Sequence, residues 1–131
     1  MSNVVILGVF VADNTYRAPR QPRIGETILG SNFALGPGGK GSNQAVAAAR
    51  LGADVTFISK IGEDPFGDMA MALWAEVGVK TEVQRVPESY TGAASIFLEE
   101  SSGNNAIIIC PGAATTLSPA SIDAVGDVIR A

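Results

Sequence analysis

The stretch GPGGKGSN, from Gly36 to Asn43, is followed directly by the alanine-rich run QAVAAARL and then by Gly52. Alanine and unbranched side chains favour a helix in this run, Ser42 or Asn43 can cap its start, and Gly52 can end it. Glycines ahead of a helix let a ligand approach the backbone, and the first helical turn offers unpaired N–H groups. The sequence therefore predicts a loop that binds a small molecule at the beginning of a helix.

Two phosphate-binding patterns can be compared with this loop. The Walker A pattern G-x-x-x-x-G-K-[ST] fails, because Ala34 stands at its first glycine position and Gly41 follows Lys40. Gly36, Gly38 and Gly41 do satisfy the dinucleotide-binding pattern G-x-G-x-x-G, and an acidic pair follows the next predicted strand. That pattern is weak when it stands alone, so a dinucleotide-binding protein of the Rossmann type remains an alternative.

A sugar or polyol site fits the same loop. Lys40 supplies a mobile cation, and the amide of Asn43 can both donate and accept hydrogen bonds. Asp13 can accept from sugar hydroxyls, and it follows the apolar, strand-like run 4–11. Ligands of open α/β sheets bind beyond the carboxyl ends of strands. The plainer interpretation is that the glycines only permit close packing of the helix against a sheet.

Strand-like and helix-like segments alternate along the rest of the chain. Besides the strand 4–11 and the helix after the loop, the patterns predict short strands within 27–35, a strand at 55–61, a helix from Asp64 and Pro65 to Gly78, a hairpin of 93–99 with 106–110, and a last helix from Ser118 to the end. This order predicts one α/β domain, residues 1–131, with a doubly wound, mostly parallel sheet and a small β lid from about 15–35 and 90–110. A last helix with no strand after it indicates a truncated domain.

Composition excludes several classes of function. Hydrophobic residues make up 47 % and charged residues 17 % of the chain, which is typical of a folded domain. The net charge is −4 and the nine basic residues are scattered, so we expect no nucleic-acid partner. The sequence contains no run of 18 apolar residues, so no membrane span is predicted. The chain has no histidine, which excludes His-based triads and His-ligated zinc, and we predict no metal site.

Cys110 is the only cysteine, and it lies in the apolar run 106–110, so we expect it to be buried in the core. A lone cysteine offers no disulfide framework, which predicts a reducing, cytoplasmic compartment. Glu63 and Asp64 could together bind Mg²⁺. Capping of the following helix by Asp64 is the favoured interpretation of this pair.

The stretch GGKGSNQAVAAARLGADVTFISKIGEDPFG resembles the N-terminal signature of the ribokinase-like (PfkB) carbohydrate kinases, most closely the ribokinase branch. The resemblance covers the whole chain, and the other matching pieces fall in family order: Asp13, PRIGETILG, Gly62-Glu63-Asp64 with Gly67, Tyr90-Thr91-Gly92, and Pro111-Gly112-Ala113. It implies a kinase that transfers the γ-phosphoryl group of ATP to a sugar hydroxyl, with Mg²⁺ and a monovalent cation such as K⁺.

The resemblance also implies a set of site residues. Sugar contacts are implied for Asp13, Gly39, Lys40 and Asn43, a loop-shaping role for Gly38, Gly41 and Ser42, and an apolar wall on the lid for Ala94, Ile96 and Ile109. In the family the lid covers the substrate and often forms a dimer interface, so a homodimer is expected. Ribokinases commonly carry asparagine two residues before the aspartate. Here that residue is Val11, which cannot hydrogen-bond a hydroxyl, so the sugar need not be ribose.

The family's nucleotide pocket, cation site and Gly-Ala-Gly-Asp-like catalytic motif lie in its C-terminal part and have no counterpart in these 131 residues. We therefore expect a sugar-binding half with no catalytic residue of its own, inactive alone and binding neither ATP nor a metal ion. The alternative from another class is a non-catalytic sugar-binding or dimerisation module from a truncated gene.

Overall fold

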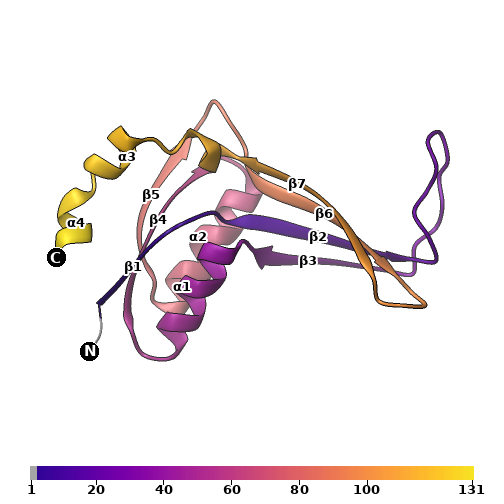
Figure 1. The fold of residues 1–131 in the computed structure, drawn as a ribbon, viewed down its shortest axis with the longest axis horizontal. Helices are drawn as coiled ribbons and strands as arrows, with labels where there is room; N and C mark the ends of the chain where they lie inside the picture. The colour runs from indigo at the N-terminus through magenta and orange to yellow at the C-terminus, as the bar shows by residue number, and fades with distance from the viewer. Residues whose placement is uncertain (1–2) are drawn as a thin grey trace.

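The computed structural model describes residues 3–131, and within them the strands form two sheets (Figure 1). The first, which we call the body sheet, is parallel and has the order β1 (Asn3–Leu7), β4 (Asp54–Gly62), β5 (Lys80–Val86). The second, which we call the lid sheet, has the order β3 (Asn32–Gly38), β2 (Val11–Ala18), β6 (Thr91–Glu99), β7 (Asn105–Gly112). Its two central strands are parallel, and each outer strand is antiparallel to its neighbour.

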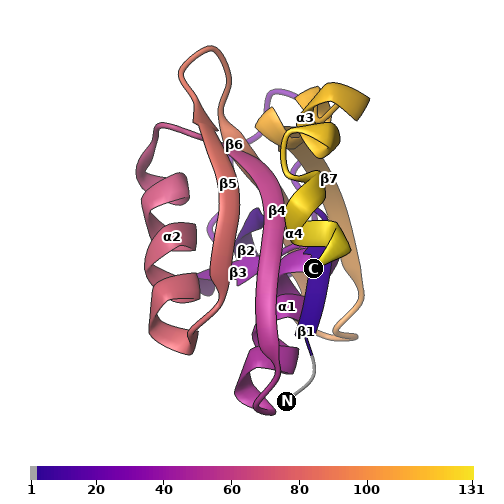
Figure 2. The same ribbon diagram turned by 90° about the vertical axis from the view of Figure 1, so that its left-hand side faces the viewer.

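Helices lie on both faces of the body sheet (Figure 2). One face is covered by α1 (Lys40–Arg50) and α2 (Pro65–Val77), and the other carries the short elements η1 (Ala113–Thr116), α3 (Pro119–Asp123) and α4 (Gly126–Arg130). A parallel sheet with helices on both faces confirms the predicted α/β class. None of the helices in residues 3–131 has the length and apolarity that a membrane span requires.

Trp74 is the centre of the core between the body sheet and its two long helices. Its side chain is fully buried, and its ring lies 5.7 Å from that of Phe10 and 5.1 Å from that of Phe57, centroid to centroid. The indole Nε1 donates a 3.0 Å hydrogen bond to Ser42 Oγ on α1. The same side chain thus joins α2, α1, β4 and the segment between β1 and β2.

The predicted strand 4–11 is wrong in one respect: it is two strands in two sheets. The chain leaves the body sheet after Gly8, whose amide donates to the Ile58 carbonyl at 3.1 Å, and enters the lid sheet at Val11. A Cβ atom on Gly8 would lie only 2.8 Å from the Cα of Gly41, so α1 packs directly against this crossing. Asp13 therefore lies inside β2, three residues beyond Phe10, rather than in a loop after a strand.

The two long helices differ in how well their ends were predicted. Asp64 caps α2 by accepting from the Gly67 amide, Pro65 is its first residue, and Gly78 ends it in the left-handed conformation, all as predicted. Gly52 ends α1 with a φ of 94°, as predicted, but the predicted N-terminal caps, Ser42 or Asn43, are wrong. That helix begins already at Lys40, and Gly39 occupies its N-cap with a φ of 92° and no side-chain hydrogen bond.

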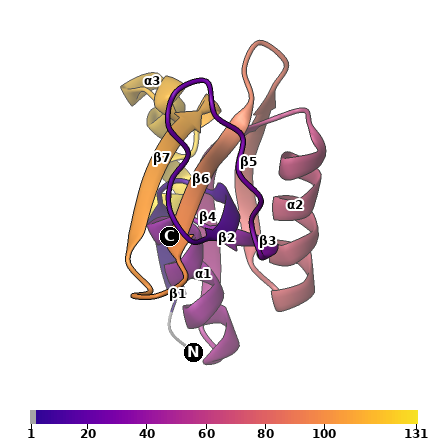
Figure 3. The same cartoon turned by 90° about the vertical axis from the view of Figure 1, so that its right-hand side faces the viewer.

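The hairpin is confirmed as β6 and β7, but two other expectations change and one strand was not predicted. The predicted strand 27–35 forms only from Asn32, and residues 19–31 make a long loop at the far end of the lid sheet (Figure 3). The edge strand β5 was not predicted, because three of its seven side chains are polar and exposed. The last helix does begin at Ser118 and Pro119, but it breaks into α3 and α4 at Ala124–Val125.

Cys110 is exposed, which contradicts its predicted burial. It lies on β7, an outer strand of the lid sheet, and the lid is a single layer over most of its length (Figure 1). An apolar run on such a strand has no second layer to cover it. The neighbouring Ile107, Ile108 and Ile109 are more than half exposed for the same reason.

Candidate functional site

The predicted loop and Asp13 meet in a cleft where the lid sheet joins the body. The cleft has a volume of about 570 Å³. Its wall is formed by the crossing from β1 to β2, by β2, by the start of α1 and by the end of β7, and its lining residues are Leu7, Gly8, Val9, Val11, Asp13, Gly39, Lys40, Gly41, Asn43, Gln44, Ile109 and Pro111. Residues more than 90 positions apart in the sequence thus form one concave surface at the base of the lid.

Asp13 lies on the central lid strand β2, in register with Gly36 on one side and Ala94 on the other. Its carboxylate lies over the backbone of Gly38, where a Cβ atom would collide with it. Partial burial raises the pKa of the Asp13 carboxyl above its ordinary value of 3.8. Within residues 3–131 the structure shows no hydrogen bond to this carboxylate, so both of its oxygens are available to hydroxyl donors of a ligand.

Packing explains why two positions of the loop are glycine. A side chain on Gly39 would collide with the Val9 carbonyl, and one on Gly41 would lie 2.8 Å from the Cα of Gly8. The plainer interpretation, close packing of the helix start, is thus correct for these two positions. That same packing presents the first turn of α1, with Lys40 and Asn43, to the cleft.

The ten predicted site residues fall into three groups. Asp13, Gly39, Lys40, Gly41, Asn43 and Ile109 line the cleft. Three others lie beside it: Gly38 lies under the Asp13 carboxylate, Ala94 lies between Asp13 and Ile109 in the strand register, and Ile96 lies two residues further along the same face of the lid. Ser42 points into the core and binds Trp74, so the structure does not bring it to the cleft.

Gln44 and Pro111 also line the cleft, and neither was predicted as a site residue. Gln44 follows Asn43 in the first turn of α1, so its position in the sequence was a usable signal. Pro111 becomes part of the cleft only because β7 ends there, which depends on pairing between distant strands.

Val11 gives this cleft an apolar element close to the carboxylate. It is two residues before Asp13 on the same strand, so both side chains point to one face of the lid sheet. Val11 is 2 % exposed and lines the cleft. A ligand group that reaches this part of the wall meets methyl groups and no hydrogen-bonding partner.

The acidic pair Glu63 and Asp64 can be compared with the geometry of a metal site. Residues 3–131 contain no group of three or more His, Cys, Asp or Glu side chains placed to hold a metal ion. The carboxylate of Asp64 accepts hydrogen bonds from the Gly67 amide and from the amide and hydroxyl of Thr91. These bonds agree with the capping interpretation of Asp64.

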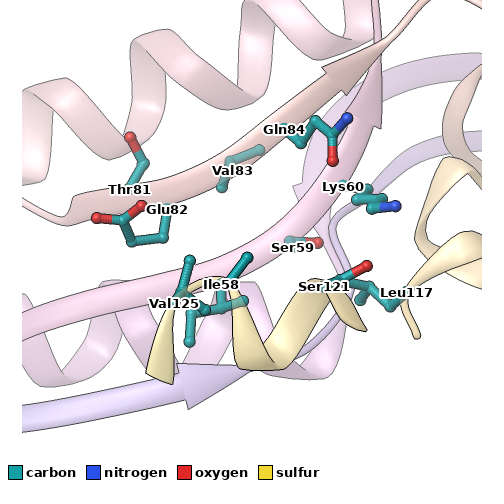
Figure 4. Close-up of a pocket in the computed structure, with 11 residues that line it drawn as sticks. Ile58, Ser59, Lys60, Thr81, Glu82, Val83, Gln84, Leu117, Ser121 and Val125 are labelled. Carbon is teal, nitrogen blue, oxygen red and sulfur yellow. The ribbon is translucent and has the colours of Figure 1, made fainter. Parts of the chain in front are cut away.

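A second, smaller cavity of about 250 Å³ lies on the opposite side of the body sheet, between β4, β5 and the α3–α4 segment (Figure 4). Ile58 and Val125 lie at one end, and Lys60 and Gln84 lie toward the other. None of the ten predicted site residues lines it.

Comparison with known proteins agrees with this architecture. The sequence matches the family model described as "pfkB family carbohydrate kinase" over residues 1–129. The chain belongs to the pfkB family. Among curated pfkB-type relatives, it is 40 % identical over 121 residues to the ribokinase of Bacillus subtilis, covering 92 % of this chain and 41 % of that protein. It is 36 % identical over 129 residues to the deoxyribokinase of Salmonella typhi, covering 98 % of this chain and 42 % of that protein.

Solved structures show the same relationship to the pfkB fold. The ribokinase of Giardia lamblia superimposes with a TM-score of 0.86 at 35 % identity, over 98 % of this chain and 38 % of that one. The ribokinase of Arabidopsis thaliana, determined with ribose and ATP, has a TM-score of 0.79 at 37 % identity, over 86 % of this chain and 37 % of that one. The chain thus spans about two fifths of the length of the relatives it matches.

Replacing Asp13 by asparagine should raise the free energy of unfolding at neutral pH, because the variant no longer places a charge in a partly buried position. The raised pKa means that the folded chain binds this proton more tightly than the unfolded chain does. The wild type should therefore recover stability relative to Asp13→Asn as the pH falls through the pKa of Asp13, above 3.8. Urea denaturation of both chains measures the difference in their free energies of unfolding, which should be smaller below pH 3.8 than at neutral pH.

The exposed Asp123 on α3 provides the control, since Asp123→Asn removes a charge far from the cleft. A stability difference between wild type and Asp13→Asn that is the same at both pH values would mean that Asp13 is not withdrawn from water.

Proposed function

We propose that this chain supplies the sugar-binding part of a pfkB carbohydrate kinase, an enzyme that transfers the γ-phosphoryl group of ATP to a sugar hydroxyl. One observation carries the proposal: the partly buried carboxylate of Asp13 shares a cleft with Asn43 and with the start of α1. Carboxylate, amide and backbone N–H groups can hydrogen-bond the hydroxyls of a sugar, and the apolar part of the wall can pack against its carbon atoms.

In this proposal each group has a separate task. Asp13 accepts hydrogen bonds from one or two sugar hydroxyls, and Asn43 donates to and accepts from others. The backbone at Gly39 and Gly41 lets the sugar approach the helix start, and Lys40 lies at the rim as a mobile cation. Ile109 packs against the apolar face of the sugar, with Ala94 behind it. Hydrogen bonds to a charged group contribute about 1.5–3 kcal/mol each, so the contacts to Asp13 would dominate affinity.

Val11 supports a sugar that carries fewer hydroxyl groups than ribose. A hydroxyl placed against this buried side chain would lose its hydrogen bonds to water and find no partner, at a cost of about 1–3 kcal/mol. A deoxyribokinase stands among the relatives beside the ribokinases. We therefore propose that 2-deoxyribose binds at least as tightly as ribose.

The Asp13→Asn variant should bind its sugar at least about tenfold more weakly than the wild type, because an amide presents one acceptor where the carboxylate presents two charged oxygens. Calorimetric titration of this chain with ribose and with 2-deoxyribose measures the effect and ranks the two sugars. Asp123→Asn, remote from the cleft, should bind as the wild type does. Unchanged affinity in Asp13→Asn would remove Asp13 from the site, and tighter binding of ribose would refute the role given to Val11.

ATP, Mg²⁺ and a monovalent cation would be held by other parts of such an enzyme. Ribokinases of Arabidopsis thaliana and Cryptococcus neoformans have been solved with ATP and ADP respectively. These 131 residues contain no Gly-Ala-Gly-Asp-like motif, and phosphoryl transfer depends on groups that position and neutralise the transferred phosphoryl.

The 131-residue chain should accordingly release no ADP above background when it is supplied with ATP, Mg²⁺, K⁺ and ribose or 2-deoxyribose. A coupled ADP-release assay measures this, with an active ribokinase as the positive control. Turnover that follows the chain through purification would show that the described residues are sufficient for catalysis.

A second proposal is that two copies of the chain form a homodimer through their lids. Such a dimer would also be expected if the chain were a non-catalytic binding or dimerisation module. The lid face opposite the cleft carries Tyr16, Phe33, Leu35 and Ile108, which we call the outer patch. These side chains are 49 %, 53 %, 45 % and 71 % exposed, and the first two rings lie 5.2 Å apart. An apolar surface of this kind is typical of a protein–protein contact.

Cys110 is exposed on the same face of the lid as the outer patch. We propose that the protein lies in a reducing, cytoplasmic compartment, which keeps this thiol free.

Phe33→Asp should convert a dimer of this chain to a monomer, because a carboxylate would be buried in the contact without a partner. Sedimentation velocity over a range of concentrations measures the change. Leu51→Asp, at the exposed end of α1, places the same charge outside the outer patch and should leave the dimer intact. A wild-type chain that stays monomeric at the highest concentration would refute this contact.

A further inference from the structure

The position of the lid over the cleft is set where the chain crosses between the two sheets. Within residues 3–131 the chain enters or leaves the lid sheet at four places: from β1 at 7–11, into α1 at 38–40, from β5 at 86–91, and into η1 at 112–113. Three of them are held by backbone packed against glycine, at Gly8, Gly39 and Gly112. The crossing from β5 to β6 also packs against glycine, at Gly62 and Gly112, but in addition a cluster of polar side chains holds its end.

The centre of this cluster is a set of hydrogen bonds between Asp64 and Thr91, the first residue of β6. The Thr91 amide donates to Asp64 Oδ2 at 2.8 Å, and the Thr91 hydroxyl donates to Asp64 Oδ1 at 2.6 Å. The hydroxyl also accepts from the Gly62 amide at 2.9 Å, and Thr91 is 1 % exposed. Both polar groups of Thr91 that face the body are thus fixed by the loop between β4 and α2.

Arg85 and two glycines complete the cluster. The Arg85 guanidinium donates to the Gly62 carbonyl at 3.1 and 3.2 Å and to the Asp64 carbonyl at 3.3 Å. A side chain on Gly62 would lie 2.7 Å from the Thr91 amide nitrogen, and one on Gly67 would collide with the Gly62 carbonyl. Burial tends to raise the pKa of Asp64, but the hydrogen bonds from Thr91 and Gly67 and the charge of Arg85 lower it below 3.8 overall, so the carboxylate stays charged.

Capping of α2 does not require this arrangement. The cap needs only the bond from the Gly67 amide to Asp64 Oδ1, which is 2.8 Å long. The other two bonds to the carboxylate come from Thr91, across the boundary between body and lid. Asp64 therefore connects the start of a body helix with the start of a lid strand.

The start of β6 leads directly to the proposed sugar site. Three residues after Thr91, Ala94 pairs with Asp13 on one side and with Ile109 on the other. The parallel ladder between β2 and β6 is continuous from Val11↔Gly92 to Ala18↔Glu99. A shift of the first residue of β6 would move this ladder, and with it the carboxylate of Asp13, relative to the start of α1.

We propose that Asp64 and Thr91 are positioning residues that hold the lid at the angle at which Asp13 and Asn43 engage one sugar. The inference rests on the proposed function, and it gives the sequence pieces Gly62-Glu63-Asp64 with Gly67 and Tyr90-Thr91-Gly92 a shared role. Neither side chain touches the sugar. Both act through the placement of β6.

The experiment combines peptide-resolved hydrogen exchange with sugar titration of the whole chain. Thr91→Val keeps the shape of the side chain and removes its hydroxyl. Asp64→Asn keeps a good helix cap but places an amide group against the Thr91 amide. Thr91→Ser restores the hydroxyl. Thr81→Val, on β5 and outside the cluster, is the matched control for a threonine on a strand.

In Thr91→Val and Asp64→Asn, exchange at the start of β6 should accelerate about tenfold or more while exchange in the centre of β4 stays at the wild-type rate, since the loss of one or two hydrogen bonds opens the lid locally. Affinity for the sugar should fall in parallel. Thr91→Ser and Thr81→Val should resemble the wild type in both measurements.

Uniform acceleration of β4 and β6 would show that the cluster contributes only global stability and would overturn the inference. Sugar affinity at the wild-type level with accelerated exchange in β6 would overturn it as well. If the wild type binds no sugar, the proposed function fails separately. The exchange rates then still decide the claim about the lid, since unchanged rates in β6 would refute it.

Discussion

The start of α1 packs against the crossing between β1 and β2 with almost no side chain between the two backbones. A single Cβ on Gly8 or Gly41 would lie 2.8 Å from the opposing Cα, and one on Gly39 would collide with the Val9 carbonyl. Interiors are close-packed, so contacts of this kind tolerate no added atoms. This contact places the first turn of the helix beside Asp13, two residues after the crossing ends at Val11. The cleft therefore depends on glycine at positions that themselves contribute no side chain.

The same contact explains why Trp74 and Ser42 lie where they do. With α1 so close to the crossing, Ser42 faces inward, and its hydroxyl becomes the acceptor for the indole of Trp74. A buried indole N–H without an acceptor would cost about 1–3 kcal/mol. The loop sequence thus serves two surfaces of the helix start, one toward the core at Ser42 and one toward the cleft at Lys40 and Asn43.

Features specified by local chemistry could be predicted from the sequence, and features that depend on distant packing could not. Asp64, Pro65 and Gly78 mark the ends of α2 because capping involves only neighbouring backbone groups. The split of the strand 4–11 depends on the contact between Gly8 and Gly41, which no local pattern reveals. The exposure of Cys110 likewise depends on β7 being an outer strand of a single-layered lid. Within the candidate site, Asp13 and Asn43 were predicted from their residue types and both line the cleft, whereas Pro111 joins the cleft only through the pairing of β7 with β6.

One strand of the body sheet has a consequence for handling the protein. β1 is paired on one side only, and its exposed edge presents the backbone of the apolar segment NVVIL, with Leu7 53 % exposed. An unpaired apolar edge is a template for further strands from any chain that offers them. Pairing of this edge with the opposite edge strand β5 of another copy would be open-ended, whereas contact between two identical lid faces closes after two copies. The size distribution of the associated chain therefore distinguishes the two modes: a series of growing oligomers indicates pairing at the strand edges, and dimers alone indicate contact between lid faces.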